Sequence, residues 1–180
     1  MSLLLPALLA ASQLAALPAP TSRVCSSVEV VAPGQRRATK RKTFSAKKTL
    51  DLKLQTFLKS KRKVSGDHLL QLKVYTPRGY LYQTITVPFY RQPRRSEKRR
   101  PEDLQFEPVR VVPGFPRALD VQKTRRARLG RKRYDRVTAR LPVAGTSITL
   151  GSLFGRWTVV PFLDNGTAPC GRPRGFKILE

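Results

Sequence analysis

The alternation of apolar and polar residues is clearest over residues 68–89, where it predicts a β-hairpin. In the first half, Leu70, Leu72 and Val74 are separated by polar side chains, which is the two-residue period of a half-buried strand. The second half, rich in Tyr, Thr and Ile, alternates in the same way. Residues 76–79, Thr-Pro-Arg-Gly, predict a type I turn closed by a bulge at the glycine. Because an isolated hairpin is only marginally stable, further strands must cover its apolar face.

The same alternation predicts more short strands on both sides of the hairpin. Residues 50–58 place leucines on one face, and residues 137–143 alternate apolar with polar side chains. Residues 157–163 precede the turn sequence Asp-Asn-Gly at 164–166. About six to eight strands separated by turns are typical of an all-β chain with a single antiparallel β-sandwich. The shorter candidate strands are residues 107–112, 148–150 and 176–179.

The apolar positions that face inward on these strands are expected to share one core. Every second residue of a strand lies on the same face, and the two sheets of a sandwich pack their apolar faces together. The predicted core residues are Leu52, Leu54, Leu70, Leu72, Val74, Leu81, Ile85, Val87, Val137, Leu141, Trp157 and Val159.

Charge changes this picture, because the 180 residues include 36 Lys and Arg but only 11 Asp and Glu, for a net charge of +25. Such an excess favours an anionic polymer or surface as partner, and the alternative is arginine enrichment on a solvated surface. The charge also suggests an organisation. Residues 23–48 are expected to be a flexible basic arm, and residues 49–180 a β-sandwich domain with a basic insert at 91–133.

Residues 1–22 predict an apolar leader with the pattern of a secretory signal peptide, because residues 2–22 carry no charged side chain. The leader favours export to the periplasm, the cell surface or the medium. However, no Lys or Arg precedes the apolar run, and the first arginine is Arg23. The alternative is an intracellular or organellar location.

The basic insert holds most of the candidate binding residues. Its charge density predicts a segment that is poorly ordered in isolation, with residues 119–133 forming either a helical turn or a loop. Exposed cations bind polyanions with little selectivity, through counterion release on nucleic acid or attraction to acidic lipids. The candidate polyanion-binding residues are Arg94, Arg95, Lys98, Arg99, Arg100, Arg125, Arg126, Arg128, Arg131, Lys132 and Arg133.

Two stretches carry a resemblance. Residues 74–83 (VYTPRGYLYQ) together with residues 151–157 (GSLFGRW) resemble uncharacterised exported β-sandwich proteins of myxobacteria. The turn pattern x-Pro-x-Gly followed later by Gly-x-Trp-x-Val is also similar to immunoglobulin-like and macroglobulin-like modules. The resemblance covers about residues 50–89 and 134–179. It implies an immunoglobulin-like sandwich and an exported location, and it implies no chemistry.

Catalytic chemistry is not indicated. A Ser-His-Asp or Cys-His site would need His68, the only histidine, for which a solvated or capped position beside Asp67 at a strand end is favoured. One His and two Cys have no zinc-ligand spacing, and no glycine-rich phosphate loop with its lysine is present. We therefore expect no catalytic residue, metal or cofactor. Cys25 and Cys170 are either a disulfide or two unrelated thiols.

These observations lead to two functional hypotheses. The first is a non-catalytic exported interaction or adhesion module that binds an anionic polymer or surface, such as lipopolysaccharide, acidic lipid or nucleic acid. The second is an intracellular or organellar basic protein that binds nucleic acid, for example on the ribosome. For the second, the tyrosines of the hairpin could stack on bases, although cross-strand pairing is favoured for them. No small-molecule substrate is indicated, and the oligomeric state stays open. The tyrosines are Tyr75, Tyr80, Tyr82 and Tyr90.

Overall fold

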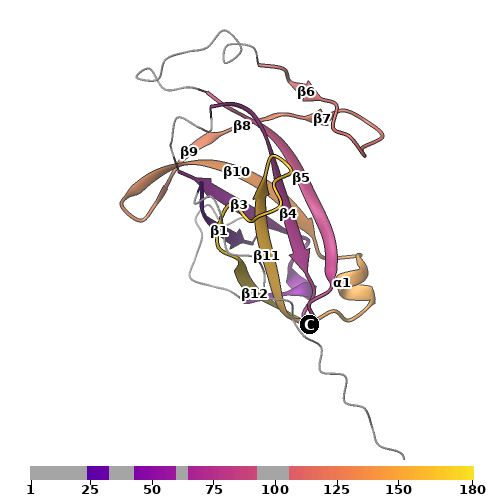
Figure 1. Cartoon of the computed structure of the whole chain (residues 1–180). Helices are drawn as coiled ribbons and strands as arrows, with labels where there is room; N and C mark the ends of the chain where they lie inside the picture. Colours follow the sequence, from indigo (N-terminus) through magenta and orange to yellow (C-terminus); the bar gives the residue numbers. More distant parts are fainter. Residues whose placement is uncertain (1–23, 33–42, 60–64, 93–105) are drawn as a thin grey trace, which may run out of the picture.

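A computed structural model describes residues 24–32, 43–59, 65–92 and 106–180. The described residues form an all-β fold built mainly from antiparallel pairs, which confirms the predicted class (Figure 1). The predicted leader, residues 1–22, lies outside the described residues. So do five candidate binding residues, namely Arg94, Arg95, Lys98, Arg99 and Arg100.

Two sheets make up most of the fold. Sheet A is antiparallel and has the order β1 (Cys25–Val31), β3 (Asp51–Leu58), β10 (Lys132–Pro142) and β9 (Arg125–Leu129). Sheet B has the order β2 (Thr43–Ser45), β12 (Arg174–Leu179), β11 (Gly155–Leu163), β4 (Gly66–Tyr75), β5 (Leu81–Arg91) and β8 (Gln122–Lys123). Its outermost strands, β2 and β8, join in parallel. Sheet B curls into a half-barrel, so the two sheets differ from a pair of flat layers (Figure 1).

Three smaller elements complete the described part. β6 (Val109–Arg110) and β7 (Leu119–Asp120) form a separate two-stranded ribbon. The 3-10 turn η1 (Ala46–Lys48) follows β2, and the single-turn helix α1 (Ser147–Leu150) follows β10. Within the described residues, no helix is long and apolar enough to cross a lipid bilayer.

The central hairpin is confirmed, with β4 paired to β5 along most of their length. At the turn, the Gly79 N–H donates to the Thr76 carbonyl at 2.9 Å, and the Thr76 N–H donates to the Tyr80 carbonyl at 2.8 Å. Gly79 has a φ of 85°, which an L side chain rarely adopts. This is the predicted type I turn with a bulge.

The face predicted for Leu81 is wrong, because the ladder shifts by one residue beside the turn. Val74 pairs with Gln83 and Tyr75 with Leu81, so Tyr82 is an extra residue on β5. An extra residue reverses which face the following side chains occupy. The Tyr82 ring therefore packs edge-on against Trp157 with centroids 5.2 Å apart, and Leu81 is 53% exposed.

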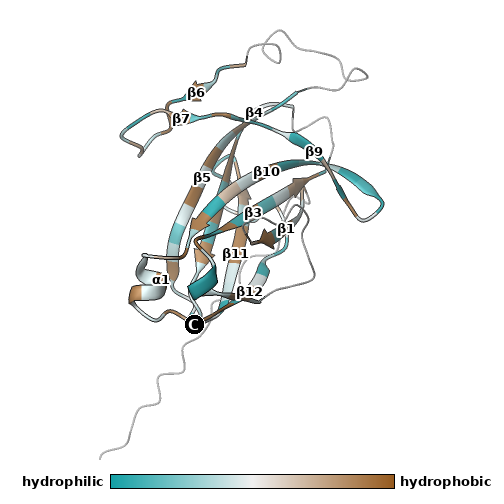
Figure 2. Ribbon diagram, turned by 180° about the vertical axis from the view of Figure 1, so that it is seen from behind, coloured by the Kyte–Doolittle hydropathy of each residue, from teal (hydrophilic) through white to brown (hydrophobic). Residues whose placement is uncertain are grey.

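The rest of the predicted core is confirmed. The remaining predicted residues are either buried in one cluster or, for Ile85 and Val87, partly buried against it. Hydrophobic and hydrophilic bands follow one another along β5 and β10, as expected when one strand face packs inward (Figure 2). The fully buried members of the predicted set are Leu52, Leu54, Leu70, Leu72, Val74, Val137, Leu141, Trp157 and Val159.

The strand predicted at residues 148–150 is instead helix α1. The Thr146 side chain accepts a hydrogen bond from the Ile148 N–H, which caps the helix and starts a turn. Ile148 is buried, whereas Leu150 is exposed, so two apolar residues at a spacing of two do not share a face here. Leu50 is also exposed, because β3 begins only at Asp51.

Two predictions of irregular structure are wrong for the described residues. The supposed arm at 23–48 contains β1 and β2, and Val28 and Val30 of β1 are buried in the core. The supposed insert at 91–133 contains β6 to β9, and the stretch 119–133 is neither helix nor loop. Pairing with β10 orders β9 although it is rich in arginine, because side chains that project into solvent do not oppose the backbone ladder.

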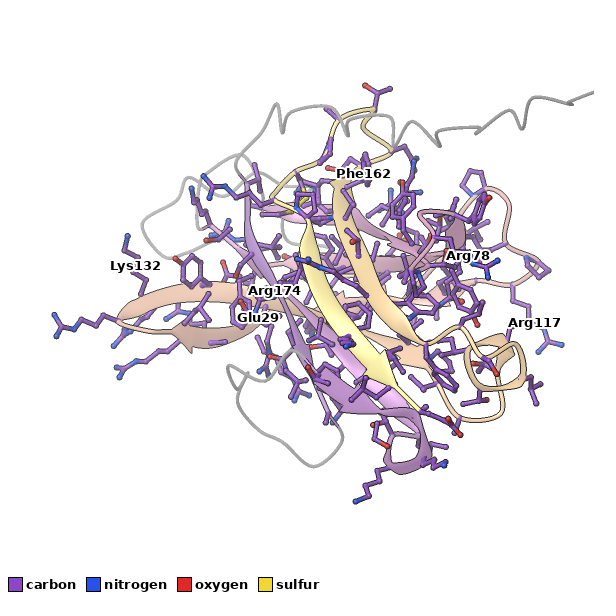
Figure 3. All side chains as sticks on the ribbon, turned by 90° about the horizontal axis from the view of Figure 1, so that it is seen from below. Glu29, Arg78, Arg117, Lys132, Phe162 and Arg174 are labelled. Atoms are coloured by element: carbon purple, nitrogen blue, oxygen red, sulfur yellow. A yellow bond between two sulfur atoms is a disulfide. The ribbon has the colours of Figure 1, made fainter. Side chains whose placement is uncertain are left out.

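Different contacts join the two sheets at their two sides. On one side, a disulfide connects Cys25 of β1 to Cys170 after β11, with Cα atoms 5.1 Å apart. There the guanidinium Nη2 of Arg174 also lies 2.7 Å from Glu29 Oε2, a pair seen in Figure 3. On the other side, Arg91 of β5 forms a buried ion pair with Asp135 of β10.

Candidate functional site

A cleft of about 1080 Å³ opens at the outer face of sheet A, where β7 and β8 pass over it. Strands from both sheets contribute to it, and most of its side chains are polar or cationic. The residues that line the cleft are Lys53, Gln55, Val87, Asp120, Val121, Gln122, Lys123, Arg125, Arg136, Thr138 and Arg140.

Strand alternation places these side chains on one face. Lys53 pairs with Arg140, and Gln55 pairs with Thr138, across the ladder between β3 and β10. The intervening residues, such as Leu54 and Ala139, face the core. The pattern that buries the core therefore presents the polar residues of both strands to the cleft.

The side chain of Gln122 holds β8 against β10. The Thr138 N–H donates to Gln122 Oε1 at 2.6 Å, and Gln122 Nε2 donates to the Thr138 carbonyl at 3.2 Å. β9 pairs with β10 only as far as Arg136. At Thr138, the side-chain amide of Gln122 therefore makes the hydrogen bonds that the backbone of a neighbouring strand would otherwise make. This contact connects the edge of sheet B to sheet A and fixes one wall of the cleft.

The cleft is strongly cationic. Among the described residues that line it, five are Lys or Arg and one, Asp120, is acidic. Arg125 and Arg136 lie directly opposite each other in the register of β9 and β10. Like charges in such a cross-strand pair destabilise the folded state, so an anion bound between them would relieve a repulsion. The five cationic residues are Lys53, Lys123, Arg125, Arg136 and Arg140.

Of the predicted binding residues that the structure describes, only Arg125 lines this cleft. Arg126 and Arg128 lie on the opposite face of β9, and Arg128 faces Arg133 across the ladder. Arg131 and Lys132 lie at the end of the β9–β10 ribbon, which projects from the body of the protein (Figure 3).

Four cleft cations were missed by the sequence analysis. Lys53, Arg136 and Arg140 alternate with core residues, so nothing in their spacing sets them apart from other outward-facing strand positions, and Lys123 is part of the stretch 119–133 that the sequence left undecided. Their spacing identifies the outward face of each strand, but it does not show that β3 and β10 are neighbours or that β8 passes above them.

His68 has a structural partner other than the predicted neighbour Asp67. Its Nδ1 lies 2.8 Å from Asp164 Oδ2, and its Nε2 lies 3.2 Å from the Ser65 carbonyl oxygen. Both partners are acceptors, so both bonds form together only when both ring nitrogens carry a proton. The Leu69 N–H also donates to Asp164 Oδ1 at 2.8 Å. The arrangement ties the turn after β11 to the start of β4.

We expect Asp164→Asn to lower the free energy of unfolding by about 1 kcal/mol at neutral pH. Partial burial disfavours the charged form of Asp164 and by itself would raise the pKa of its carboxyl. Hydrogen bonds from His68 and Leu69, together with the positive charges of His68 and Arg110, have a larger effect in the opposite direction. The pKa of the carboxyl therefore lies below its ordinary value of 3.8. A lowered folded-state pKa adds stability above the ordinary value, and this stability is lost as the pH falls through the folded-state pKa. Urea denaturation from pH 7 to pH 3 should therefore show a shallower acid decline in the variant, and parallel curves would contradict this account.

The four tyrosines do not form one exposed platform. Tyr82 packs on Trp157, and the Tyr90 ring is buried with its centroid 5.5 Å from that of Phe106. Tyr80 is exposed at the hairpin turn. This arrangement agrees with structural roles for Tyr82 and Tyr90, and it leaves no surface that all four rings share.

Searches of protein-family models, curated proteins and solved structures found nothing similar to this chain. Among the described residues, no group of three or more His, Cys, Asp or Glu side chains is arranged to hold a metal ion. The cleft is therefore interpreted from its own geometry and charge.

Proposed function

We propose that this protein is a non-catalytic interaction module that binds an anionic polymer in the basic cleft. The observation that carries the proposal is the gathering of five cationic side chains around one concave site, with two arginines directly opposed across β9 and β10. Guanidinium groups match carboxylate, sulfate and phosphate groups through paired hydrogen bonds.

The concave shape distinguishes the cleft from the rest of the basic surface. Charges interact more strongly where the surrounding protein excludes water than on a fully exposed ribbon. Arg125 and Arg136 are beside the walls formed by β3 and β8. The pair Arg128 and Arg133 has the same charge and is also directly opposed across the ladder, on the other face of the ribbon. The second pair is therefore a charge-matched control for the first.

The decisive experiment compares the double variant Arg125→Ser/Arg136→Ser with Arg128→Ser/Arg133→Ser. With heparin as the probe, we expect the cleft variant to lose affinity by about tenfold or more, and the control by about threefold or less. The cleft variant should also show a weaker dependence of affinity on salt, because fewer ionic contacts form. Both variants should melt near the wild-type temperature, because each loses a repulsive pair.

An equal loss of affinity in the two variants would show that net charge, and not the cleft, determines binding. Unchanged binding in both would remove the polymer-binding proposal for this surface. The melting curves exclude unfolding as the cause of either result.

The disulfide between Cys25 and Cys170 supports an exported location for this module. Disulfides persist in oxidising compartments such as the periplasm or the cell exterior, and they are rare in the cytosol of most organisms. The apolar residues 1–22 point in the same direction. We accordingly place its partner among the anionic polymers found outside the cytosol.

A further inference from the structure

We infer that the polymer bound in the cleft is an acidic glycan, a sugar chain that carries carboxylate, sulfate or phosphate groups. This inference rests on the proposed function and specifies its ligand. Three properties of the described lining residues carry it: one carboxylate among the cations, two small apolar side chains, and no aromatic ring.

The carboxylate of Asp120 favours a ligand that donates hydrogen bonds. An ionised aspartate accepts hydrogen bonds and cannot donate them. Asp120 is exposed in the cleft, and the ion pairs found among the described acidic residues involve other carboxylates. Beside a polymer with anionic groups alone, such as polyphosphate, this carboxylate would only repel. A glycan has hydroxyl groups that donate to it, while its acidic groups contact the cations.

The apolar part of the lining fits sugar rings better than bases. Val87, which is partly buried, and Val121, which is 8% exposed, add a small aliphatic surface to the lining that can contact the C–H groups of a sugar ring. Proteins that bind single-stranded nucleic acid stack bases on aromatic rings, and the described residues that line this cleft include no aromatic side chain. The concave form also suits a chain that enters it, whereas a bilayer presents its headgroups as a broad surface.

The test is Asp120→Asn, with Asp67→Asn as the matched control, since Asp67 is also exposed and does not line the cleft. Both substitutions raise the net charge by one unit and keep the size of the side chain. We expect Asp120→Asn to weaken binding of heparin and polygalacturonate by about tenfold, although the protein becomes more positive. Binding of long-chain polyphosphate should be unchanged or tighter. Asp67→Asn should leave all three affinities within about twofold.

Two further probes cover the other polyanions. An oligothymidylate and vesicles of phosphatidylglycerol should each bind the wild-type protein more weakly than the glycans at the same salt concentration. Stronger binding of either probe, or of polyphosphate, would overturn the glycan inference.

The inference would also be overturned if Asp120→Asn bound the glycans as tightly as the wild type or more tightly. That result leaves the proposed function standing as long as Arg125→Ser/Arg136→Ser loses affinity for polyanions. If the arginine variant keeps full affinity, the proposed site itself is wrong. The two failures are therefore distinguishable.

Discussion

Replacing Asp135 by Ala is expected to lower the free energy of unfolding by about 3–5 kcal/mol. The carboxylate Oδ2 of Asp135 lies 2.7 Å from Arg91 Nε, and the side chains are 9% and 1% exposed, respectively. Removing the carboxylate leaves a cationic guanidinium in the interior without this counter-charge. Because Arg91 is on β5 and Asp135 on β10, the loss also weakens the contact between the two sheets. Urea denaturation of the variant and the wild type measures the change.

The control is the double variant Arg91→Met/Asp135→Leu, which removes both charges together. Apolar replacements for a buried ion pair are often neutral or stabilising, so this variant should lie within about 1 kcal/mol of the wild type. A loss as large as that of Asp135→Ala would show that side-chain packing, and not the unpaired charge, explains the effect. A loss below about 1 kcal/mol in Asp135→Ala would show that other groups stabilise Arg91 sufficiently.

Removing the disulfide with Cys25→Ala/Cys170→Ala should lower the free energy of unfolding by about 2–5 kcal/mol. The bond joins residues 145 positions apart, and a cross-link across so long a loop strongly restricts the unfolded chain. The effect can be measured by thermal unfolding with and without dithiothreitol. The wild type in reductant should melt near the double variant, and the variant itself should not respond to reductant.

The contact around this disulfide is determined by more than the two sulfur atoms. The Cys25 N–H donates to the Cys170 carbonyl at 2.9 Å. A Cβ atom on Gly171 would lie 2.5 Å from the Cys25 carbonyl oxygen, so only glycine permits this approach of the two backbones. The bond lies at the β1 side of sheet A, away from β9 and β10. Loss of the disulfide should therefore leave the heparin affinity of the folded protein unchanged. If the melting temperature of the wild type did not respond to reductant, the expected stabilisation would be contradicted.

The features that depend on local spacing could be predicted from the order of the amino acids. Alternation at Leu70, Leu72 and Val74 predicted β4 and its buried face, because one side of a strand must meet the core every second residue. Residues 76–79 predicted the turn, because Pro fixes the backbone angle φ that the turn needs and Gly readily adopts a positive φ. Most of the core and the all-β class follow from the same periodicity.

The density of charged residues did not predict which segments form strands. Residues such as Arg125 and Arg128 suggested a flexible segment, yet they lie on a strand that pairs with β10. The missed strand β1 has a related explanation, because the prediction grouped its valines with the basic residues that follow them in the supposed arm at 23–48. A basic side chain on a strand can remain in water while its backbone pairs, so composition does not report whether a partner strand exists.

The place where the functional residues meet depends on how the strands pack together. Lys53, Gln122 and Arg136 come from distant parts of the chain, and strand order together with the Gln122–Thr138 contact brings them to one cleft. The pairing of Cys25 with Cys170 and the reversal of faces at Tyr82 likewise depend on long-range register. A local pattern predicts on which face of its own strand a side chain lies. Which strand lies beside it is decided by the packing of the whole chain.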